Sequence, residues 1–318
     1  MKYNEYKAGL CIMPHELNCI HDKPWVSRGK NFNIKVVEVY YPDQTKYEVR
    51  IEAPNIERAQ FVCDLIVCGI NVVEGQCDFE IRDLVAKPLH VSEKQLFVTN
   101  FGEIQIQNLF LIFDLVSKAS FRNFYINALT KYSLSVQLHS NAWVDLDPSL
   151  SGANIPVSPF PYDHLRYGYS IIIAYSILEE LKLEVRASTD KPSVKNRIMN
   201  PVVRSDLEKR LIKANINISE SIVWQRRGGK KSIESKLDKR STPAYKEKAS
   251  WSYGKVRDHI IPLTDAINEV SWIRSKIASH KVGKDIKVLS VYDVSNSQHL
   301  ARRLILECLG FWTKMKSE

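Results

Sequence analysis

The chain has 318 residues, which is enough for two domains with a sizeable core. Hydrophobic residues make up 44% of it and charged residues 25%, as is typical of a soluble globular protein. No apolar run approaches the roughly 18 residues of a membrane-spanning helix. The composition therefore excludes an integral membrane protein and predicts no membrane partner.

The N-terminus and the cysteines indicate a cytoplasmic location. The opening stretch, MKYNEYKAGLC, lacks the basic and then apolar pattern of a signal peptide. The six cysteines are scattered, with no C-x-x-C pair and no histidine at metal-ligand spacing. We therefore expect reduced core thiols, no disulfides, and no metal or other cofactor. The cysteines are Cys11, Cys19, Cys63, Cys68, Cys77 and Cys308.

Positive charge is concentrated in one segment. The chain carries a net charge of +9, but between Val185 and Arg257 nineteen Lys/Arg stand against seven Asp/Glu, a net +12. A basic block on a near-neutral body is typical of a polyanion-binding surface. Its candidate RNA contacts, in the turn QRRGGKK, are Arg226, Arg227, Lys230 and Lys231. The alternative is a solvated insertion that binds nothing.

The first third of the chain predicts an α+β domain. Residues 32–54 alternate apolar and polar side chains on both sides of the sequence PDQTK, which indicates a β-hairpin. Residues 55–72 have apolar side chains at helical spacing, with Asn55 as the N-cap. Residues 94–106 look like a further strand. We expect an N-terminal domain over residues 1–105, whose role the sequence leaves open.

From residue 106 onward the pattern becomes helical. Helices are expected over residues 108–120 and 121–139, separated near Ser120. Residues 145–163 are rich in Pro, Ser and Gly and predict a loop. The most apolar helix covers residues 164–185, and we expect it inside a bundle or at a dimer interface.

Three further helices complete the expected fold. They cover residues 205–215, with Ser205 as the N-cap, 258–280 and 295–312. The sequence thus predicts an α+β protein in which a mixed N-terminal domain precedes an all-α bundle. That C-terminal domain would span residues 106–318, with a basic insertion at about 186–251.

An arginine and a histidine stand near the end of the helix expected over residues 258–280. Arg274 precedes His280 by six positions, a spacing that a chain of this composition shows about once by chance. A histidine of pKa about 6.5 can act as a base or an acid, and an arginine can bind two phosphoryl oxygens. One imidazole cannot be both in a single step, so a two-fold dimer would supply the second group. The alternative is a surface arginine and a histidine that interacts with the helix dipole.

The surrounding sequence resembles the end of a HEPN (higher eukaryotes and prokaryotes nucleotide-binding) domain. The resemblance lies in WIRSKIASHKVG, residues 272–283, followed by YDVSNSQHLARRLILECLGF, residues 292–311. Members of this superfamily share a small helical bundle and an arginine followed, after four to six residues, by a histidine. The apolar helix over residues 164–185 is similar to an early core helix of that bundle. The resemblance covers residues 120–318 and leaves the first hundred residues unexplained.

The resemblance implies a homodimeric, metal-independent endoribonuclease with Arg274 and His280 as its catalytic residues. Such proteins commonly act as toxins or in defence against phage, cleave tRNA, mRNA or other cellular RNA, and have an antitoxin or sensor as partner. The expected products carry 2′,3′-cyclic phosphate ends. Many active members have Asn, Asp or His after the arginine, and here Ser275 occupies that supporting position.

Two points stay open in the sequence. The alternative function is a non-catalytic HEPN-like module that dimerises and binds RNA or a partner nucleotidyltransferase. The last helix also carries a second basic face, formed by His299 with Arg302 and Arg303 at the i+3 and i+4 positions. These three residues are either further RNA contacts or a solvated helix face.

Overall fold

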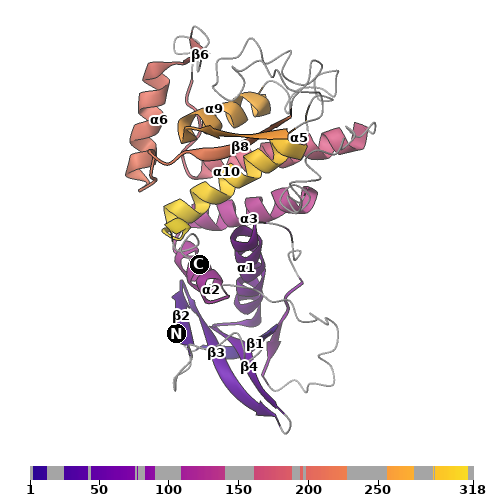
Figure 1. The fold of residues 1–318 in the computed structure, drawn as a ribbon. Coiled ribbons are helices and arrows are strands. Elements are labelled where there is room, and N and C mark those ends of the chain that lie inside the picture. The colour runs from indigo at the N-terminus through magenta and orange to yellow at the C-terminus, as the bar shows by residue number, and fades with distance from the viewer. Residues whose placement is uncertain are drawn as a thin grey trace. The chain divides into compact units, whose positions relative to one another are not determined.

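The computed structural model describes most of the chain in separate segments (Figure 1). The segments cover residues 3–12, 25–41, 44–75, 77, 83–89, 109–139, 161–187, 194–195, 198–227, 256–275, 289 and 291–313. The chain forms two compact units. The first comprises Met1–Glu74 and Asp78–Ser133, and the second comprises Gly75–Cys77 and Leu134–Glu318. We expected the boundary near residue 105, but the two units divide within a helix that begins at Asn123.

A five-stranded antiparallel sheet forms the base of the first unit, in the order β2-β3-β4-β1-β5. Its strands are β1 (Asn4–Ile12), β2 (Trp25–Gly29), β3 (Phe32–Tyr41), β4 (Gln44–Ala53) and β5 (Ala86–Pro88). The hairpin predicted over residues 32–54 is confirmed as β3 and β4, which pair from Asn33 opposite Glu52 to Tyr41 opposite Gln44.

Two helices of the first unit cover one face of this sheet. Helix α1 (Ile56–Glu74) packs on β1, β3, β4 and β5, and α2 (Leu109–Ala119) packs on β2 and β3. The predicted N-cap of α1 is confirmed, because the backbone N–H of Arg58 donates to Asn55 Oδ1 at 2.9 Å. Helix α3 (Asn123–Leu138) follows after a break at Ser120, as the sequence predicts. Helix α2 stays with the sheet because it packs on β2 and β3, so the first unit extends beyond residue 105.

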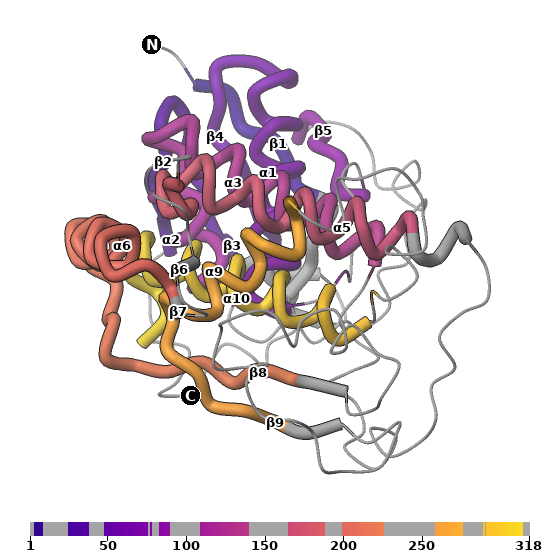
Figure 2. The backbone as a smooth tube through the Cα atoms, turned by 90° about the horizontal axis from the view of Figure 1, so that it is seen from above, coloured from indigo at the N-terminus to yellow at the C-terminus, as the bar shows by residue number. Residues whose placement is uncertain are grey.

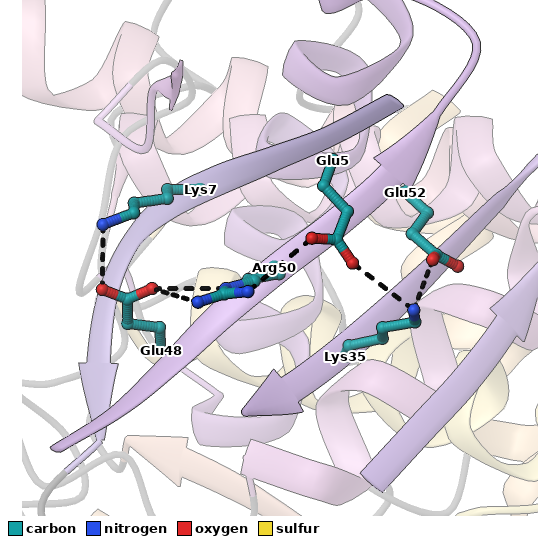
Figure 3. A network of polar contacts seen from close by, with 6 residues as sticks. All are labelled: Glu5, Lys7, Lys35, Glu48, Arg50 and Glu52. Carbon is teal, nitrogen blue, oxygen red and sulfur yellow. Dashed lines mark hydrogen bonds and ion pairs between the residues drawn. The ribbon is translucent and has the colours of Figure 1, made fainter. Parts of the chain in front are cut away.

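The opposite face of the sheet carries a network of ion pairs (Figure 3). Its members are Glu5, Lys7, Lys35, Glu48, Arg50 and Glu52. The strand register places like charges directly opposite one another, for example Lys7 and Arg50, so the attractive contacts run diagonally. Lys7 Nζ lies 3.0 Å from Glu48 Oε1, and Arg50 Nη1 lies 3.6 Å from Glu5 Oε2. Three acids and three bases balance, so these six side chains add no net charge that would attract RNA.

The second unit is arranged around a central helix, α10 (Val291–Leu309), which is buried along most of its length (Figures 1 and 2). Helices α5 (Pro161–Glu180) and α9 (Leu263–Ile273) pack on it, as does the strand β8 (Ile222–Arg227). Strand β9 (Val256–Ile261) pairs antiparallel with β8. Helix α6 (Pro201–Lys213) contacts α9, and a short hairpin of β6 (Val194–Lys195) and β7 (Ile198–Met199) precedes α6.

The mixed α+β class is confirmed, but the prediction of an all-α C-terminal domain is wrong in part. The β8–β9 ribbon belongs to the second unit, and its strand β9 includes residues 258–261, which we expected to begin a helix. Pro262 explains the difference: the residue before a proline is held in extended geometry, so the helix starts only after Pro262. Whether the helices of this unit form a HEPN-type bundle stays a prediction.

Other helix predictions differ in their bounds or fall outside the described residues. Helix α6 begins at Pro201, earlier than the expected Ser205, because Asn200 caps it by accepting a hydrogen bond from Val202 N at 3.0 Å. The strand expected over residues 94–106 lies outside the described residues, as do residues 145–160 of the loop expected over 145–163. The last three residues of that expected loop instead begin α5. Among the helices of the described segments, none is long and apolar enough to cross a membrane.

The expectation of core thiols holds for Cys63 and Cys68, whereas Cys77 and Cys308 are partly exposed. Cys63, Cys68, Cys77 and Cys308 are all free, and Cys63 and Cys68 are buried within α1. Burial raises the pKa of Cys63, of Cys68 and of Cys308 to about 12, so these thiols stay protonated at neutral pH.

These raised pKa values predict an alkaline loss of stability. In the unfolded chain a cysteine ionises near its ordinary pKa of about 9, whereas the folded chain holds the proton up to about 12. A raised folded pKa stabilises the folded state fully below the unfolded pKa and progressively less between the two pKa values. The unfolding temperature should therefore fall as pH rises from about 9 toward 12. A Cys63→Ala/Cys68→Ala variant should show a shallower fall in a thermal melt series. An equal slope in both proteins would contradict this origin.

Candidate functional site

The candidate catalytic arginine lies at the C-terminal end of α9. This helix is buried from Leu263 to Val270, and its last α-helical residue is Ile273. Arg274 keeps α-helical backbone angles (φ −55°, ψ −49°), and its N–H donates to the carbonyl oxygen of Val270. Arg274 and Ser275 belong to a π-helical turn that continues α9. Turns of this kind are frequent at functional sites.

Helix α5 holds the Arg274 side chain through two residues one helical turn apart. The guanidinium carbon lies 5.4 Å from the centroid of the Tyr175 ring, in a cation–π contact. Nη2 of Arg274 donates to Glu179 Oε1 at 3.3 Å. The Tyr175 hydroxyl also lies 3.2 Å from Ser271 Oγ, three residues before Arg274. Since Tyr175 and Glu179 are at i and i+4, one face of α5 meets one face of α9.

This geometry leaves the guanidinium accessible. The Arg274 side chain is 40% exposed, and Glu179 contacts only its Nη2 atom. Tyr175 is 4% exposed, and burial raises the pKa of its phenol, so this ring is a neutral, fixed surface beside the cation. An arginine that is partly exposed, permanently charged and held by two contacts is suited to bind the oxygens of a phosphate.

Of the other two residues of the expected site, the structure describes Ser275 but not His280. The Ser275 hydroxyl donates to the backbone oxygen of Ser271 at 2.9 Å, as serines in helices often do. It therefore bonds its own helix in this structure. His280 lies outside the described residues, so the pairing of Arg274 with His280 stays a prediction.

The three residues of the second basic face on α10 differ in their exposure to solvent. His299 and Arg302 are partly exposed, and the Arg302 guanidinium lies 3.2 Å from the position that a Cβ at Gly75 would occupy. Arg303, in contrast, is 1% exposed. We expected Arg303 either on a solvated face or in contact with RNA, and its burial excludes both in this structure.

Arg303 instead stabilises the connection between α6 and β8. Its Nε donates to Glu307 Oε1 at 2.6 Å, and its Nη1 donates to the carbonyl oxygen of Ser221 at 2.9 Å. Nη2 donates to the carbonyl oxygen of Glu220 at 3.1 Å. Glu307 in turn accepts a hydrogen bond from the backbone N–H of Asn217 at 3.0 Å. A paired buried charge is stable only with such partners, so the 217–221 segment is fixed against α10.

Two amides of α10 have a similar role. The Asn296 side chain accepts from Gln225 N at 2.9 Å and donates to Gln225 O at 2.8 Å, so it pairs with the edge of β8 as a neighbouring strand would. Gln298 Nε2 donates to the carbonyl oxygens of Ser135 and His139 at 2.9 and 2.8 Å, near the end of α3. It also lies 2.9 Å from Ser170 Oγ on α5.

The candidate RNA contacts of the basic block lie at the end of the β8–β9 ribbon. Arg226 and Arg227 are the last two residues of β8, and Lys230 and Lys231 lie outside the described residues. The register places Arg226 directly opposite Arg257 of β9.

Several residues of this region were missed by the sequence analysis. Tyr175 and Glu179 lie within a helix that was interpreted only as apolar, and nothing in the spacing links them to Arg274, about a hundred residues later. Arg204 was counted only as part of the basic block, yet it donates to Asp265 Oδ1 at 2.5 Å and Thr264 Oγ1 at 3.0 Å. Both contacts come from tertiary packing of α5 and α6 against α9.

Metal chemistry has no candidate site among the described residues, since no group of three His, Cys, Asp or Glu side chains there could hold an ion. Compared with models of known protein families, with curated proteins and with solved structures, the chain shows no significant match. The resemblance to HEPN domains therefore remains a hypothesis that rests on the sequence.

The Arg303 contacts predict a large effect on stability. Arg303→Met should lower the free energy of unfolding by about 3–5 kcal/mol, because it leaves Glu307 buried without its charge partner. Arg302→Met, one residue away and partly exposed, should cost about 1 kcal/mol or less. Urea denaturation measures both. Equal effects of the two substitutions would contradict the structural role, and adding Glu307→Leu to Arg303→Met should recover much of the loss.

Proposed function

We propose that this chain is a metal-independent endoribonuclease of the HEPN type, with Arg274 and His280 in a site that a homodimer completes. The observation that carries the proposal is the Arg274 side chain, which is 40% exposed yet held by two contacts with α5 at the C-terminal end of α9. The substrate is a cellular RNA such as tRNA or mRNA, and the biological role is that of a toxin or an anti-phage effector.

In the proposed reaction the RNA supplies its own nucleophile. A base removes the proton of a ribose 2′-hydroxyl, the 2′-oxygen attacks the adjacent phosphorus, and the bond to the 5′-oxygen breaks. His280 of one protomer acts as the base, and the same residue of the second copy protonates the departing 5′-oxygen. Arg274 stabilises the negative charge that builds on the phosphoryl oxygens. The products are a 2′,3′-cyclic phosphate and a 5′-hydroxyl.

RNA binding is assigned to the ribbon end of the basic block. Part of the block is already engaged in ion pairs: Arg186, Arg204 and Arg210 have acidic partners in Glu184, Asp265 and Asp206. Arg226 and Arg257, opposite each other on β8 and β9, lie at the base of the segment with the largest number of remaining lysines and arginines. The ribbon end is therefore favoured over α6 as the surface that binds phosphates.

A second candidate function is a non-catalytic HEPN-like module that binds RNA or a partner nucleotidyltransferase. Ser275 favours it, because this residue stands where active members have Asn, Asp or His, and its hydroxyl bonds to Ser271 O within its own helix. Cleavage assays on purified protein separate the two candidates, since only the first produces new RNA ends.

The nuclease proposal predicts that Arg274→Ala and His280→Ala abolish cleavage. Loss of a general acid or base costs about 10²- to 10⁴-fold in rate, and loss of a charge-stabilising donor about 10²- to 10³-fold. Purified protein is incubated with total RNA in EDTA, and the product ends are identified. Both variants should remain folded homodimers by light scattering, as the wild type should. Wild-type activity that requires magnesium, or 5′-phosphate products, would contradict the mechanism.

The assignment of RNA binding to the ribbon predicts a salt dependence. If about six cations contact phosphates, the log–log plot of affinity for single-stranded RNA against salt should have a slope of about −4. Replacement of Arg226, Arg227, Lys230 and Lys231 by Ala should flatten this slope. The control replaces Arg210, which is engaged with the exposed Asp206, and should leave the slope unchanged. An unchanged slope in the fourfold variant would assign the block to a solvated insertion.

A further inference from the structure

We propose that Tyr175 and Glu179 of α5 are positioning residues for Arg274. The inference rests on the proposed nuclease function and goes beyond it, because neither residue belongs to the arginine–histidine pair. Each acts through Arg274 rather than on the substrate. Tyr175 fixes the plane in which the guanidinium lies, and Glu179 fixes which of its edges remains available for a phosphate.

The Tyr175 ring is a rigid support. It is 4% exposed, and its hydroxyl lies 3.2 Å from Ser271 Oγ, so the ring is attached to the same helix that carries Arg274. The guanidinium carbon lies 5.4 Å from the ring centroid. A flexible arginine side chain loses rotamer freedom when it binds a phosphate, and the ring removes part of that freedom beforehand. The support therefore favours binding in one orientation.

Glu179 orients the Arg274 side chain but adds little to the stability of the fold. Its side chain is 42% exposed and that of Arg274 is 40% exposed, so solvent screens their attraction. The contact joins Glu179 Oε1 to Nη2 of Arg274 at 3.3 Å. Nη2 carries two N–H donors, one parallel to the N–H of Nε and one parallel to an N–H of Nη1. Glu179 takes one of them and leaves the other edge of the guanidinium to a phosphate. A phosphate that approaches Arg274 there is bound by two parallel N–H donors.

Glu179 has two opposing effects: its charge weakens the binding of RNA, while its hydrogen bond to Arg274 favours cleavage. Its negative charge repels the phosphate that Arg274 attracts, while its hydrogen bond orients the guanidinium for the transition state. Removing the charge should therefore tighten RNA binding and slow cleavage at the same time. A purely structural residue would not do this, because local unfolding weakens binding and slows cleavage together. This split between affinity and rate distinguishes a positioning role.

The first experiment compares Glu179→Gln with the wild type. Affinity is measured with a fluorescent single-stranded RNA whose 2′-hydroxyls are methylated, which removes the nucleophile. A charge removed at about 6 Å in a watery environment should tighten the Kd roughly threefold. The kcat for cleavage of unmodified RNA should fall about 10- to 100-fold, as expected for a misplaced catalytic group. Glu208→Gln on α6 removes the same charge elsewhere in the second unit and should change neither quantity.

The second experiment separates the ring of Tyr175 from its hydroxyl. Tyr175→Phe keeps the ring beneath Arg274 and should retain kcat within about threefold, whereas Tyr175→Leu should lose about tenfold or more. The Arg274 Nε–Hε signal in an NMR spectrum, assigned by its loss in Arg274→Lys, reports the contact without cleavage. The ring current should displace this signal in the wild type and in Tyr175→Phe, and the displacement should vanish in Tyr175→Leu.

The outcomes separate this inference from the nuclease proposal. A wild-type protein that cleaves, with Arg274→Ala inactive and with Glu179→Gln and Tyr175→Leu at wild-type kcat, overturns the positioning role and leaves the nuclease intact. A parallel loss of affinity and rate in folded Glu179→Gln also overturns it. A wild-type protein that does not cleave RNA overturns the nuclease proposal itself. Opposite changes in affinity and kcat, together with the displaced NMR signal, support the inference.

Discussion

The buried guanidinium of Arg303 is the contact on which the second unit most depends. A charge that is 1% exposed would be strongly unfavourable without partners, and here a carboxylate and backbone carbonyls of the 217–221 segment surround it. Asn296 and Gln298 apply the same principle to β8 and to the end of α3. Helix α10 thus supplies polar side chains to backbone groups that would otherwise be buried without hydrogen bonds. Those pairings specify where its neighbours lie.

The position of the candidate site follows from these contacts. Gln298 reaches Ser170 on α5, so the helix that carries Tyr175 and Glu179 is tied to α10 by a hydrogen bond as well as by apolar packing. Helix α9 is held from another direction, because Arg204 of α6 pairs with the buried Asp265 in its first turn. The two helices that meet at Arg274 are each anchored well away from it. An accessible arginine can therefore have a defined orientation although its own ion pair is solvent-screened.

Local patterns predicted the elements well, and tertiary contacts account for what was missed. The hairpin of β3 and β4, the N-cap Asn55 and the break at Ser120 follow from alternation, capping chemistry and periodicity, all of which act over a few residues. Strand β9 was mistaken for helix because an apolar run of this length fits either period, and the proline after it decided the outcome. Glu179 could not be linked to Arg274, nor Arg303 to the core, because helical spacing alone does not reveal which partner helix a face meets.

The fates of the arginines show why net charge is an incomplete guide to a binding surface. Arg303 is buried among carbonyls, Arg204 is bound to Asp265 and Arg210 to Asp206, so each contributes to formal charge but little to attraction at a distance. Arg274, outside the basic block, keeps 40% of its side chain exposed. A count of charges along the sequence treats these residues as equal, whereas their burial and ion pairing determine how strongly each one attracts an anion. If the chain binds RNA, its affinity should depend on the exposed, unpaired lysines and arginines. The slope of affinity against salt concentration measures how many of them bind phosphates, because only cations that displace counterions from phosphates contribute to it.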